Sequence, residues 1–285
     1  MDKPATAPFR FTTTVGLGTW HFGERGSERR AEIAALIGAL EAGYRLFDTA
    51  EMYAAGRAES LLGEALRAFG VGKRPQLQIV SKVLPSNASA EGTVRACEQS
   101  LKRLGCDYLD LYLLHWEGSY AFEQTLEGML RLHQQGKIRA WGVSNFDQRV
   151  MARWALAEKR LGVPGRCAAN QIYYSLLARG AEFDLIPALQ QQSILLMAYT
   201  PLGSGSLASD PRLKALAAPR GLSAAQLALA WCLRQPGCVV IPKSSQLVRI
   251  RENLKAADLR LDADCLKAID SLYPPPRAKQ ALAMI

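Results

Sequence analysis

Residues 76–115 read QLQIVSKVLPSNASAEGTVRACEQSLKRLGCDYLDLYLLH, and this stretch decides the fold. It opens with a short apolar run at Gln76–Ser81, continues with a longer amphipathic stretch at 89–104, and ends with a second apolar run at Tyr108–His115. Ser89 is a residue type that commonly caps the start of a helix. Two apolar runs joined by one helix are typical of neighbouring parallel strands, because such strands need a long crossover connection. The stretch therefore predicts a strand–helix–strand unit.

The same unit recurs along nearly the whole chain. The other strand candidates are Val15–Thr19, Tyr44–Asp48, Ile138–Ser144, Cys167–Ile172, Ile194–Tyr199 and Cys238–Ile241. The other helix candidates are 28–42, 57–69, 123–135, 147–161, 182–191, 223–235 and 246–257. Eight strands that alternate with eight helices predict an α/β fold, a closed (β/α)8 TIM barrel that forms one domain over residues 1–285. Residues 1–14 are expected to form a leading β-hairpin or arm, and residues 258–285 a closing helix and tail.

An open, doubly wound sheet is the rival architecture. It normally places a Gly-x-Gly-x-x-Gly sequence after its first strand, whereas Gly16-Leu-Gly18 is followed here by Thr-Trp-His. The Gly-Lys pairs at 72–73 and 136–137 lack the upstream glycine of a phosphate-binding loop. Both observations favour the closed barrel.

The composition is that of a large globular chain. With 49% hydrophobic and 21% charged residues, the 285-residue chain can bury a sizeable core and is too apolar to be disordered. Lys and Arg number 35 against 26 Asp and Glu, so the net charge is +9. That charge would suit a polyanion, an anionic membrane surface or a phosphorylated small molecule. The basic residues come as scattered pairs without a long run, so nucleic acid is the least supported partner.

Cysteine, histidine and the N-terminal residues bear on the compartment and on metal binding. The six cysteines form no Cys-x-x-Cys pair and are expected to be reduced and packed. His21, His115 and His133 lie at no metal-ligand spacing with one another or with a cysteine, so no metal is expected. The N-terminus has no apolar signal-peptide core, and no apolar run reaches the roughly 18 residues that a membrane span needs. We therefore expect a cytoplasmic protein with no membrane partner.

Four polar residues stand where the chemistry of a barrel belongs. Asp48, Lys82 and His115 each follow or end an apolar run, and Tyr53 follows Asp48 by five positions. The carboxyl ends of barrel strands meet at the face that carries the active site, so these side chains should gather there. Each alone could be a helix cap, a solvated end or a packed aromatic. Together they could transfer a proton. The Lys82 ammonium, kept charged by Asp48, would lower the pKa of Tyr53 below its usual value of about 10, and His115 could hydrogen-bond a carbonyl oxygen.

Eight stretches, taken together, point to a known family. In chain order they are GLGTW (16–20), GYRLFDTAEMYAAGRAESLLGEAL (43–66), IVSK (79–82), DLYLLHW (110–116), GKIRAWGVSNF (136–146), NQ (170–171), AYTPLGSGSL (198–207) and VVIPKSSQLVRIREN (239–253). In this order they resemble the aldo-keto reductases, most specifically at the Asp48/Tyr53 stretch and at Ile-Pro-Lys-Ser. The resemblance implies a (β/α)8 barrel that reduces aldehydes and ketones with NADPH, which agrees with the fold predicted from periodicity.

The resemblance assigns a role to each of the four polar residues. It makes Tyr53 the general acid that protonates the carbonyl oxygen, and Lys82, paired with Asp48, the group that poises this tyrosine. His115 would orient the carbonyl. The retained histidine favours ordinary aldehyde or ketone reduction over the steroid double-bond reduction of members that carry Glu at this position.

The resemblance also implies the residues that bind the nicotinamide part of the cofactor. Ser144, Asn145 and Gln171 would hold the carboxamide, and Tyr199 would lie beneath the ring. Hydrogen-bonding side chains and a flat aromatic surface can fix which face of the ring donates hydride. The other residues placed along the cofactor are Gly18, Thr19, Trp20, Pro201, Leu202 and Ser204.

A phosphate site can be predicted near residue 250 from spacing alone. Arg249, Glu252 and Asn253 share one helix face, and Ser244 stands near the expected helix start, where free backbone N–H groups favour an anion. Lys243 adds a second cation. Two cations suit an adenosine 2′-phosphate better than a bare ribose, so NADPH is the expected cofactor. The alternative is that these residues form only a solvated helix end and bind no phosphate.

The substrate pocket is predicted from aromatic residues and short loops. Trp20 and Trp116, with Phe22 and Tyr53, could wall the carbonyl site, although a tryptophan of this kind often belongs to the core. The chain also departs from many animal members, which carry Glu-x-His-Pro where Ile172–Ser175 stands here. It looks more like the bacterial reductases of methylglyoxal and other small reactive aldehydes.

Two further functions stay open from the sequence. One is an NADPH-binding regulatory subunit with negligible turnover, as some relatives of this fold couple cofactor binding to a membrane channel. The other is polyanion binding driven by the charge of +9. The family is often monomeric, and no apolar stripe in the sequence argues for an oligomer.

Overall fold

A ring of eight parallel strands forms the centre of the protein. The computed structural model describes residues 9–285. The strands are β1 (Leu17–Gly18), β2 (Leu46–Asp48), β3 (Gln78–Val83), β4 (Leu111–Leu114), β5 (Trp141–Ser144), β6 (Cys167–Tyr173), β7 (Leu195–Tyr199) and β8 (Cys238–Val240). They pair in sequence order from β1 to β8. Val240 N donates to Thr14 O at 2.9 Å and Gly16 N donates to Val240 O at 2.8 Å, so the last strand also meets the first and the barrel is closed. The predicted (β/α)8 fold is confirmed.

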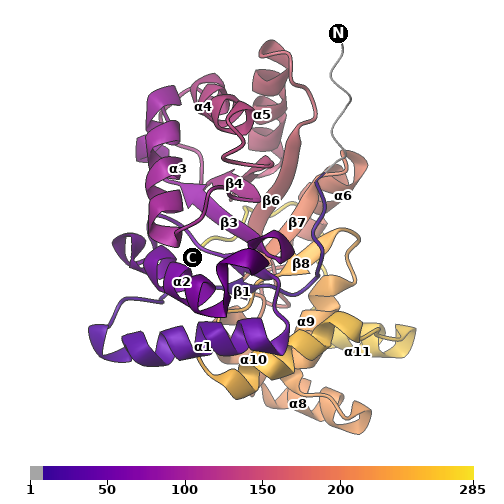
Figure 1. Ribbon diagram of the computed structural model, residues 1–285. Helices are drawn as coiled ribbons and strands as arrows, with labels where there is room; N and C mark the ends of the chain where they lie inside the picture. Colours follow the sequence, from indigo (N-terminus) through magenta and orange to yellow (C-terminus); the bar gives the residue numbers. More distant parts are fainter. Residues whose placement is uncertain (1–8) are drawn as a thin grey trace.

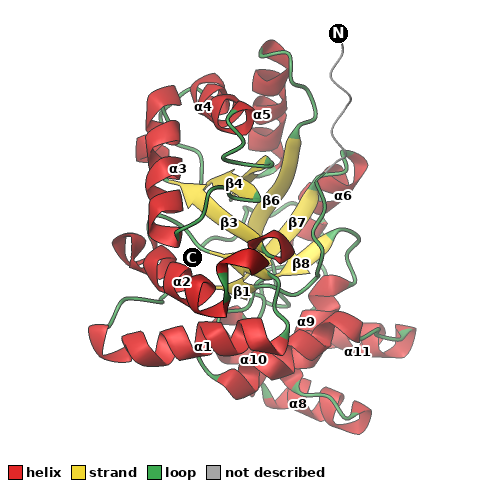
Figure 2. Ribbon diagram, viewed as in Figure 1, coloured by secondary structure: helices red, strands yellow, loops and turns green. Residues whose placement is uncertain are grey.

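Helices surround the strands on the outside (Figures 1 and 2). They are α1 (Arg29–Ala42), α2 (Arg57–Phe69), α3 (Ala90–Leu104), α4 (Phe122–Gln134), α5 (Gln148–Arg160), α6 (Leu185–Gln191), α7 (Ser206–Ser209), α8 (Pro211–Ala217), α9 (Ala224–Leu233), α10 (Leu247–Leu254) and α11 (Ala263–Leu272). Short 3₁₀ segments lie at Gly26–Glu28, Tyr53–Gly56, Val71–Gln76, Pro85–Asn87, Gly180–Glu182, Gly203–Gly205, Ala218–Arg220 and Lys255–Asp258. Every predicted strand and helix overlaps an observed one. The short helices α7 and α8 were not predicted.

The strands place polar side chains at one end of the barrel by simple alternation. Side chains at every second position point inward, and in β3 these are Gln78, Val80 and Lys82. The apolar inward residues form one cluster: Leu46, Val80, Leu111, Leu113, Ala140, Ala169, Met197, Val239 and Ile241. The outward residues of the strands belong to a second core beneath the helices. The last inward position of a strand is therefore the place where a polar group can leave the apolar cluster and face the open end.

Glycine in β1 reflects crowding at the closure of the barrel. A Cβ on Gly18 would lie 2.8 Å from the carbonyl oxygen of Ile241, which is closer than two such atoms approach. Gly18 N also donates to Pro242 O at 3.2 Å. Only a residue without a side chain lets the first strand lie this close to the segment after β8.

The leading β-hairpin is not found in the part of the segment that the structure describes. Residues 9–14 form no strand, and residues 1–8 lie outside the described residues. Gln78 takes the place of a partner strand, because its Oε1 accepts from Thr12 N at 2.8 Å and its Nε2 donates to Arg10 O at 2.8 Å. Phe9 and Phe11 pack against the inward apolar cluster. The segment is an arm that covers the amino-terminal end of the barrel.

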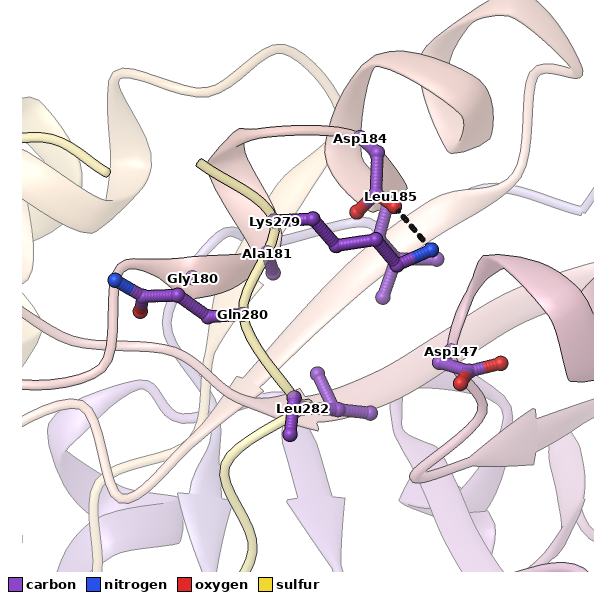
Figure 3. Close-up of a pocket in the computed structure, with 9 residues that line it drawn as sticks. Asp147, Gly180, Ala181, Asp184, Leu185, Lys279, Gln280 and Leu282 are labelled. Atoms are coloured by element: carbon purple, nitrogen blue, oxygen red, sulfur yellow. Dashed lines mark ion pairs between the residues drawn. The ribbon is translucent and has the colours of Figure 1, made fainter. Parts of the chain in front are cut away.

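The chain ends as predicted, with a helix and a tail. After α11 the tail contains no helix or strand, and Lys279 Nζ lies 2.8 Å from Asp184 Oδ2 (Figure 3). Together with Gln280 and Leu282, this ion pair lines a small hollow of about 150 Å³ beside the loop at Gly180. All six cysteines are free, and five are buried. Over residues 9–285, no helix combines the length and the apolar character that crossing a bilayer requires.

Candidate active site

A cavity of about 1030 Å³ opens at the carboxyl ends of the strands. Most of the residues predicted for catalysis or binding line it: Gly18, Trp20, Asp48, Tyr53, His115, Trp116, Ser144, Asn145, Gln171, Tyr199, Pro201, Leu202, Ser204, Lys243, Ser244, Arg249, Glu252 and Asn253. Three predicted residues, Thr19, Phe22 and Lys82, do not line it. Positions far apart in the sequence thus meet at one face of the barrel.

We call Asp48, Tyr53, Lys82 and His115 the proton-transfer group. Lys82 lies completely buried beneath the cavity floor and connects members of this group by hydrogen bonds. Its Nζ donates to Asp48 Oδ2 at 2.7 Å, to the carbonyl oxygen of Thr49 at 2.9 Å and to Tyr53 Oη at 3.1 Å. An ammonium group has three hydrogens, and each has an oxygen partner here. The tyrosine hydroxyl is therefore held at a fixed place on the floor of the cavity.

Burial controls the proton affinities of this group. Loss of water raises the pKa of Asp48 and lowers that of Lys82, and the attraction between the two charges opposes both changes. The pKa of Tyr53 lies well above its ordinary value, because burial and the negative charge of Asp48 both disfavour a phenolate. The predicted pKa below 10 for Tyr53 is therefore wrong, because burial and Asp48 outweigh the positive charge of Lys82. Tyr53 keeps its proton at neutral pH, as a proton donor must.

His115 is a neutral imidazole beside Tyr53. Burial and the positive charge of Lys82 lower its pKa to about 2. The His115 and Tyr53 ring centroids are 5.8 Å apart, in an edge-on arrangement. Its Nδ1 is buried without a hydrogen-bond partner among the described residues. The residue also lines the cavity, and a neutral imidazole keeps one ring N–H that can donate to a ligand oxygen without adding charge.

Amide and hydroxyl groups of the cavity lining form one connected network, in which Asn145 Nδ2 donates to Ser144 Oγ at 3.2 Å. Gln171 Nε2 donates to Asp48 Oδ1 at 2.7 Å, and the Ser144 hydroxyl donates to the carbonyl oxygen of Gln171 at 2.9 Å. Tyr199 Oη donates to Asn145 Oδ1 at 2.8 Å. Asn145 has a left-handed backbone with φ of 61°, which asparagine tolerates better than most residues. These contacts orient the wall before any ligand binds.

The far end of the cavity carries exposed cations. Lys243 and Arg249 are exposed, and within residues 9–285 neither makes an ion pair with a carboxylate. Ser244 and Asn253 beside them are buried. The predicted shared face of α10 is confirmed, since Arg249, Glu252 and Asn253 all line the cavity. Helix α10 begins at Leu247, and its preceding residue Gln246 donates its backbone N–H to Ser244 Oγ at 3.1 Å.

Besides Lys82, two of the predicted residues lie away from the cavity wall. Phe22 is completely buried in the outer core, so it cannot wall a substrate. The chain reverses at His21, whose φ is 66°, and Phe22 N donates to Thr19 O at 2.9 Å, so Phe22 turns under the floor. Thr19 is also completely buried, and its hydroxyl donates to the carbonyl oxygen of Asp48 at 3.0 Å. Trp20 and Trp116 remain as the aromatic wall.

Several lining residues were not predicted. Lys214 reaches the cavity from α8, and Met284 and Ile285 reach it from the tail. Asp210 and Pro211 are a sequence signal from which the start of helix α8 could have been predicted. In the structure Asp210 caps the helix by accepting from Arg212 N at 2.8 Å, and Pro211 lies in its first turn. No local pattern in the tail marks Met284 or Ile285 as neighbours of the site.

Comparisons with known proteins agree with this geometry. The sequence model described as the aldo/keto reductase family matches residues 14–274. The methylglyoxal reductase YeaE of Escherichia coli (strain K12) is 45% identical over 95% of this chain and 94% of its own length. An aldo/keto reductase of Klebsiella pneumoniae, solved in complex with NADP and acetate, is 43% identical, covers 95% of each chain and has a TM-score of 0.89. A second structure from that organism, with the same identity, coverage and TM-score, is a complex with NADPH.

Proposed function

Since the chain belongs to the aldo/keto reductase family, we propose that it reduces small aldehydes to alcohols with NADPH. The observation that carries this proposal is the contact of 3.1 Å between Tyr53 Oη and Lys82 Nζ on the floor of a large cavity. A protonated phenol held by a buried ammonium is suited to give a proton to a carbonyl oxygen.

The cavity has the groups that NADPH would need. At one end the unpaired cations Lys243 and Arg249, with the hydroxyl of Ser244, would hold the 2′-phosphate. At the other end Ser144, Asn145 and Gln171 would hold the carboxamide. Gln171 uses its Nε2 on Asp48, which leaves its Oε1 for an amide N–H. Tyr199 would supply the surface beneath the ring, and the bound cofactor would supply hydride.

The protein's own part in the reaction is to place and protonate the carbonyl oxygen. His115, which is neutral and lines the cavity, would donate a ring N–H to that oxygen and orient it toward Tyr53. Tyr53 gives up its proton as negative charge develops on the oxygen. Lys82 then stabilises the phenolate through the hydrogen bond that it already makes, so no rearrangement is required. Asp48 keeps a countercharge on Lys82 throughout.

A small aldehyde is the substrate class that we propose. The aromatic wall consists of Trp20 and Trp116, which are half-buried and leave room for a compact carbonyl compound. The similarity to the methylglyoxal reductase of Escherichia coli supports 2-oxoaldehydes in particular. We infer a cytoplasmic detoxifying role from the reactivity of such aldehydes.

The test is the loss of absorbance at 340 nm with purified protein, NADPH or NADH, and a panel of aldehydes. The panel contains methylglyoxal, glyoxal, glyceraldehyde, benzaldehyde and pyridoxal. We expect turnover that prefers NADPH, with methylglyoxal ahead of benzaldehyde. Tight NADPH binding without turnover on any aldehyde would contradict the proposal and favour a regulatory subunit instead.

A further inference from the structure

The loop that carries Tyr53 has an unusual backbone. Ala54 and Ala55 have φ values of 49° and 54°, and Gly56 follows with 83°, so three consecutive residues are left-handed. Glycine adopts this conformation freely, but alanine does so at a cost. Such a segment keeps its shape only where its surroundings hold it.

A buried carboxylate stands one turn beyond this segment. Glu59, in the first turn of α2, is completely buried. Its Oε2 accepts from Arg103 Nε of α3 at 2.5 Å, and its Oε1 accepts from the hydroxyl of Ser81 at 2.6 Å. The side chain of Glu59 therefore ties the start of α2 to a neighbouring helix and to strand β3.

Arg103 also contacts the left-handed segment directly. A Cβ on Gly56 would lie 2.7 Å from the Cδ and Nε atoms of Arg103, so the guanidinium packs on the backbone at this point. The hydroxyl of Ser60 donates to the carbonyl oxygen of Gly56 at 3.2 Å. The Glu59–Arg103 pair thus closes over the end of the loop that begins with Tyr53.

The strand contact of Glu59 lies next to Lys82. Ser81 and Lys82 are consecutive in β3, so Ser81 points outward to Glu59 while Lys82 points inward to Asp48. The charged groups that act on Lys82 are Asp48 and Glu59, both of which favour the ammonium. Tyr53 and His115 are the other titratable groups that face it.

We propose that Glu59 is a positioning residue for the proton-transfer group, acting through Ser81 on Lys82 and through Arg103 on the Tyr53 loop. The inference rests on the proposed function, in which Tyr53 is the acid. Glu59 does not line the cavity, and its hydrogen bonds go to Ser81 and Arg103, so its substitution removes no group that would bind NADPH. It acts by holding two neighbours, the backbone before Lys82 and the backbone after Tyr53.

The experiment compares three variants by aldehyde reduction across pH. Glu59→Gln keeps the shape of the side chain and removes its charge, whereas Glu59→Asp keeps the charge and shortens the reach. Glu64→Gln is the matched control, because Glu64 lies on the same helix and pairs with Arg29 at the surface. Amide hydrogen exchange over residues 50–60 is measured in parallel, so that the loop is observed without catalysis.

We expect Glu59→Gln to lower kcat about tenfold, with the KM for NADPH changed less than about twofold. Without the second carboxylate Lys82 loses its proton at lower pH, so the alkaline limb of kcat should move down by about half a pH unit. Glu59→Asp should lower kcat while the limb stays in place. Exchange over residues 50–60 should rise in both, and Glu64→Gln should match wild type.

Other results would overturn the inference. An unchanged kcat in Glu59→Gln would do so, and so would a loss of kcat that comes with an unmoved limb, because that indicates a structural role only. A wild-type protein without turnover would instead refute the proposed function. In that case unchanged exchange over residues 50–60 in Glu59→Gln would overturn the inference as well.

Discussion

Lys82 and Arg249 contribute charges to the same cavity, one from beneath its floor and one from its rim, and they differ in their exposure to solvent. Lys82 is completely buried and gives each of its three hydrogens to an oxygen of the protein. Arg249 is exposed and, within residues 9–285, has no carboxylate partner. A buried charge is tolerated only with close partners, whereas an exposed cation can stay unpaired in water.

This difference indicates that one end of the cavity is suited to catalysis and the other to binding. The end around Lys82 is fixed by its own hydrogen bonds before any ligand arrives, so it is suited to act on a transition state. The end around Arg249 presents exposed cations that have no carboxylate partner within residues 9–285, so it is suited to hold an anionic ligand. Changes at the first end should therefore lower kcat, and changes at the second should raise KM.

Removing the buried ammonium should have the largest effect. Lys82→Met leaves Asp48 buried without its cation, which should cost about 3–5 kcal/mol of unfolding free energy and reduce kcat at least about a hundredfold. The double variant Asp48→Asn, Lys82→Met should recover part of the stability and none of the activity. Urea unfolding and steady-state kinetics measure both.

An exposed ion pair provides the control for that experiment. Lys137 Nζ lies 2.6 Å from Glu98 Oε1, with both side chains partly in water. Lys137→Met should change the unfolding free energy by less than about 1 kcal/mol. Equal losses in the two lysine variants would remove the contrast between buried and exposed charge on which the comparison depends.

Removing the exposed cation should have a moderate effect on binding alone. Arg249→Ala should raise the KM for NADPH about tenfold, since one charge-assisted contact to a phosphate is lost, and should leave kcat and the KM for NADH unchanged. Arg251→Ala on the same helix, outside the cavity, is the matched control. A similar loss with NADH would refute the phosphate assignment.

The smallest expected effect is an absence of pH dependence. Because the pKa of His115 is lowered to about 2, the imidazole is neutral above that value and stays neutral as the pH falls from 8. The kcat of reduction should therefore stay flat between about pH 8 and pH 5, where an ordinary histidine of pKa about 6.5 would titrate. A limb near pH 6.5 that His115→Asn removes would contradict this.

Much of the site could be predicted because strand periodicity is a local property. The apolar runs that end in Asp48 and His115, and the run just before Lys82, fixed both the strands and the inward direction of these residues. Their convergence then follows from the closed barrel: Asp48 and His115 line the cavity, and Lys82 contacts Asp48 beneath it.

The incorrect predictions depended on surroundings that local patterns do not contain. Phe22 looked like a neighbour of Trp20, but a left-handed residue at His21 turns it into the core. The effect of Lys82 on Tyr53 was argued from charge alone, and burial outweighs it. The expected hairpin is absent from residues 9–14. There the side chain of Gln78, rather than a partner strand, makes hydrogen bonds with the backbone N–H of Thr12 and the carbonyl oxygen of Arg10.

A single turnover of NADPH-loaded protein mixed with methylglyoxal tests the central claim most directly, with wild type compared to Tyr53→Phe. The decay of NADPH fluorescence gives the rate of the chemical step, and a prior titration gives the affinity for NADPH. We predict that Tyr53→Phe binds NADPH within about twofold of wild type and slows the decay at least about a hundredfold. A decay as fast as that of wild type would contradict the role of Tyr53 as the acid.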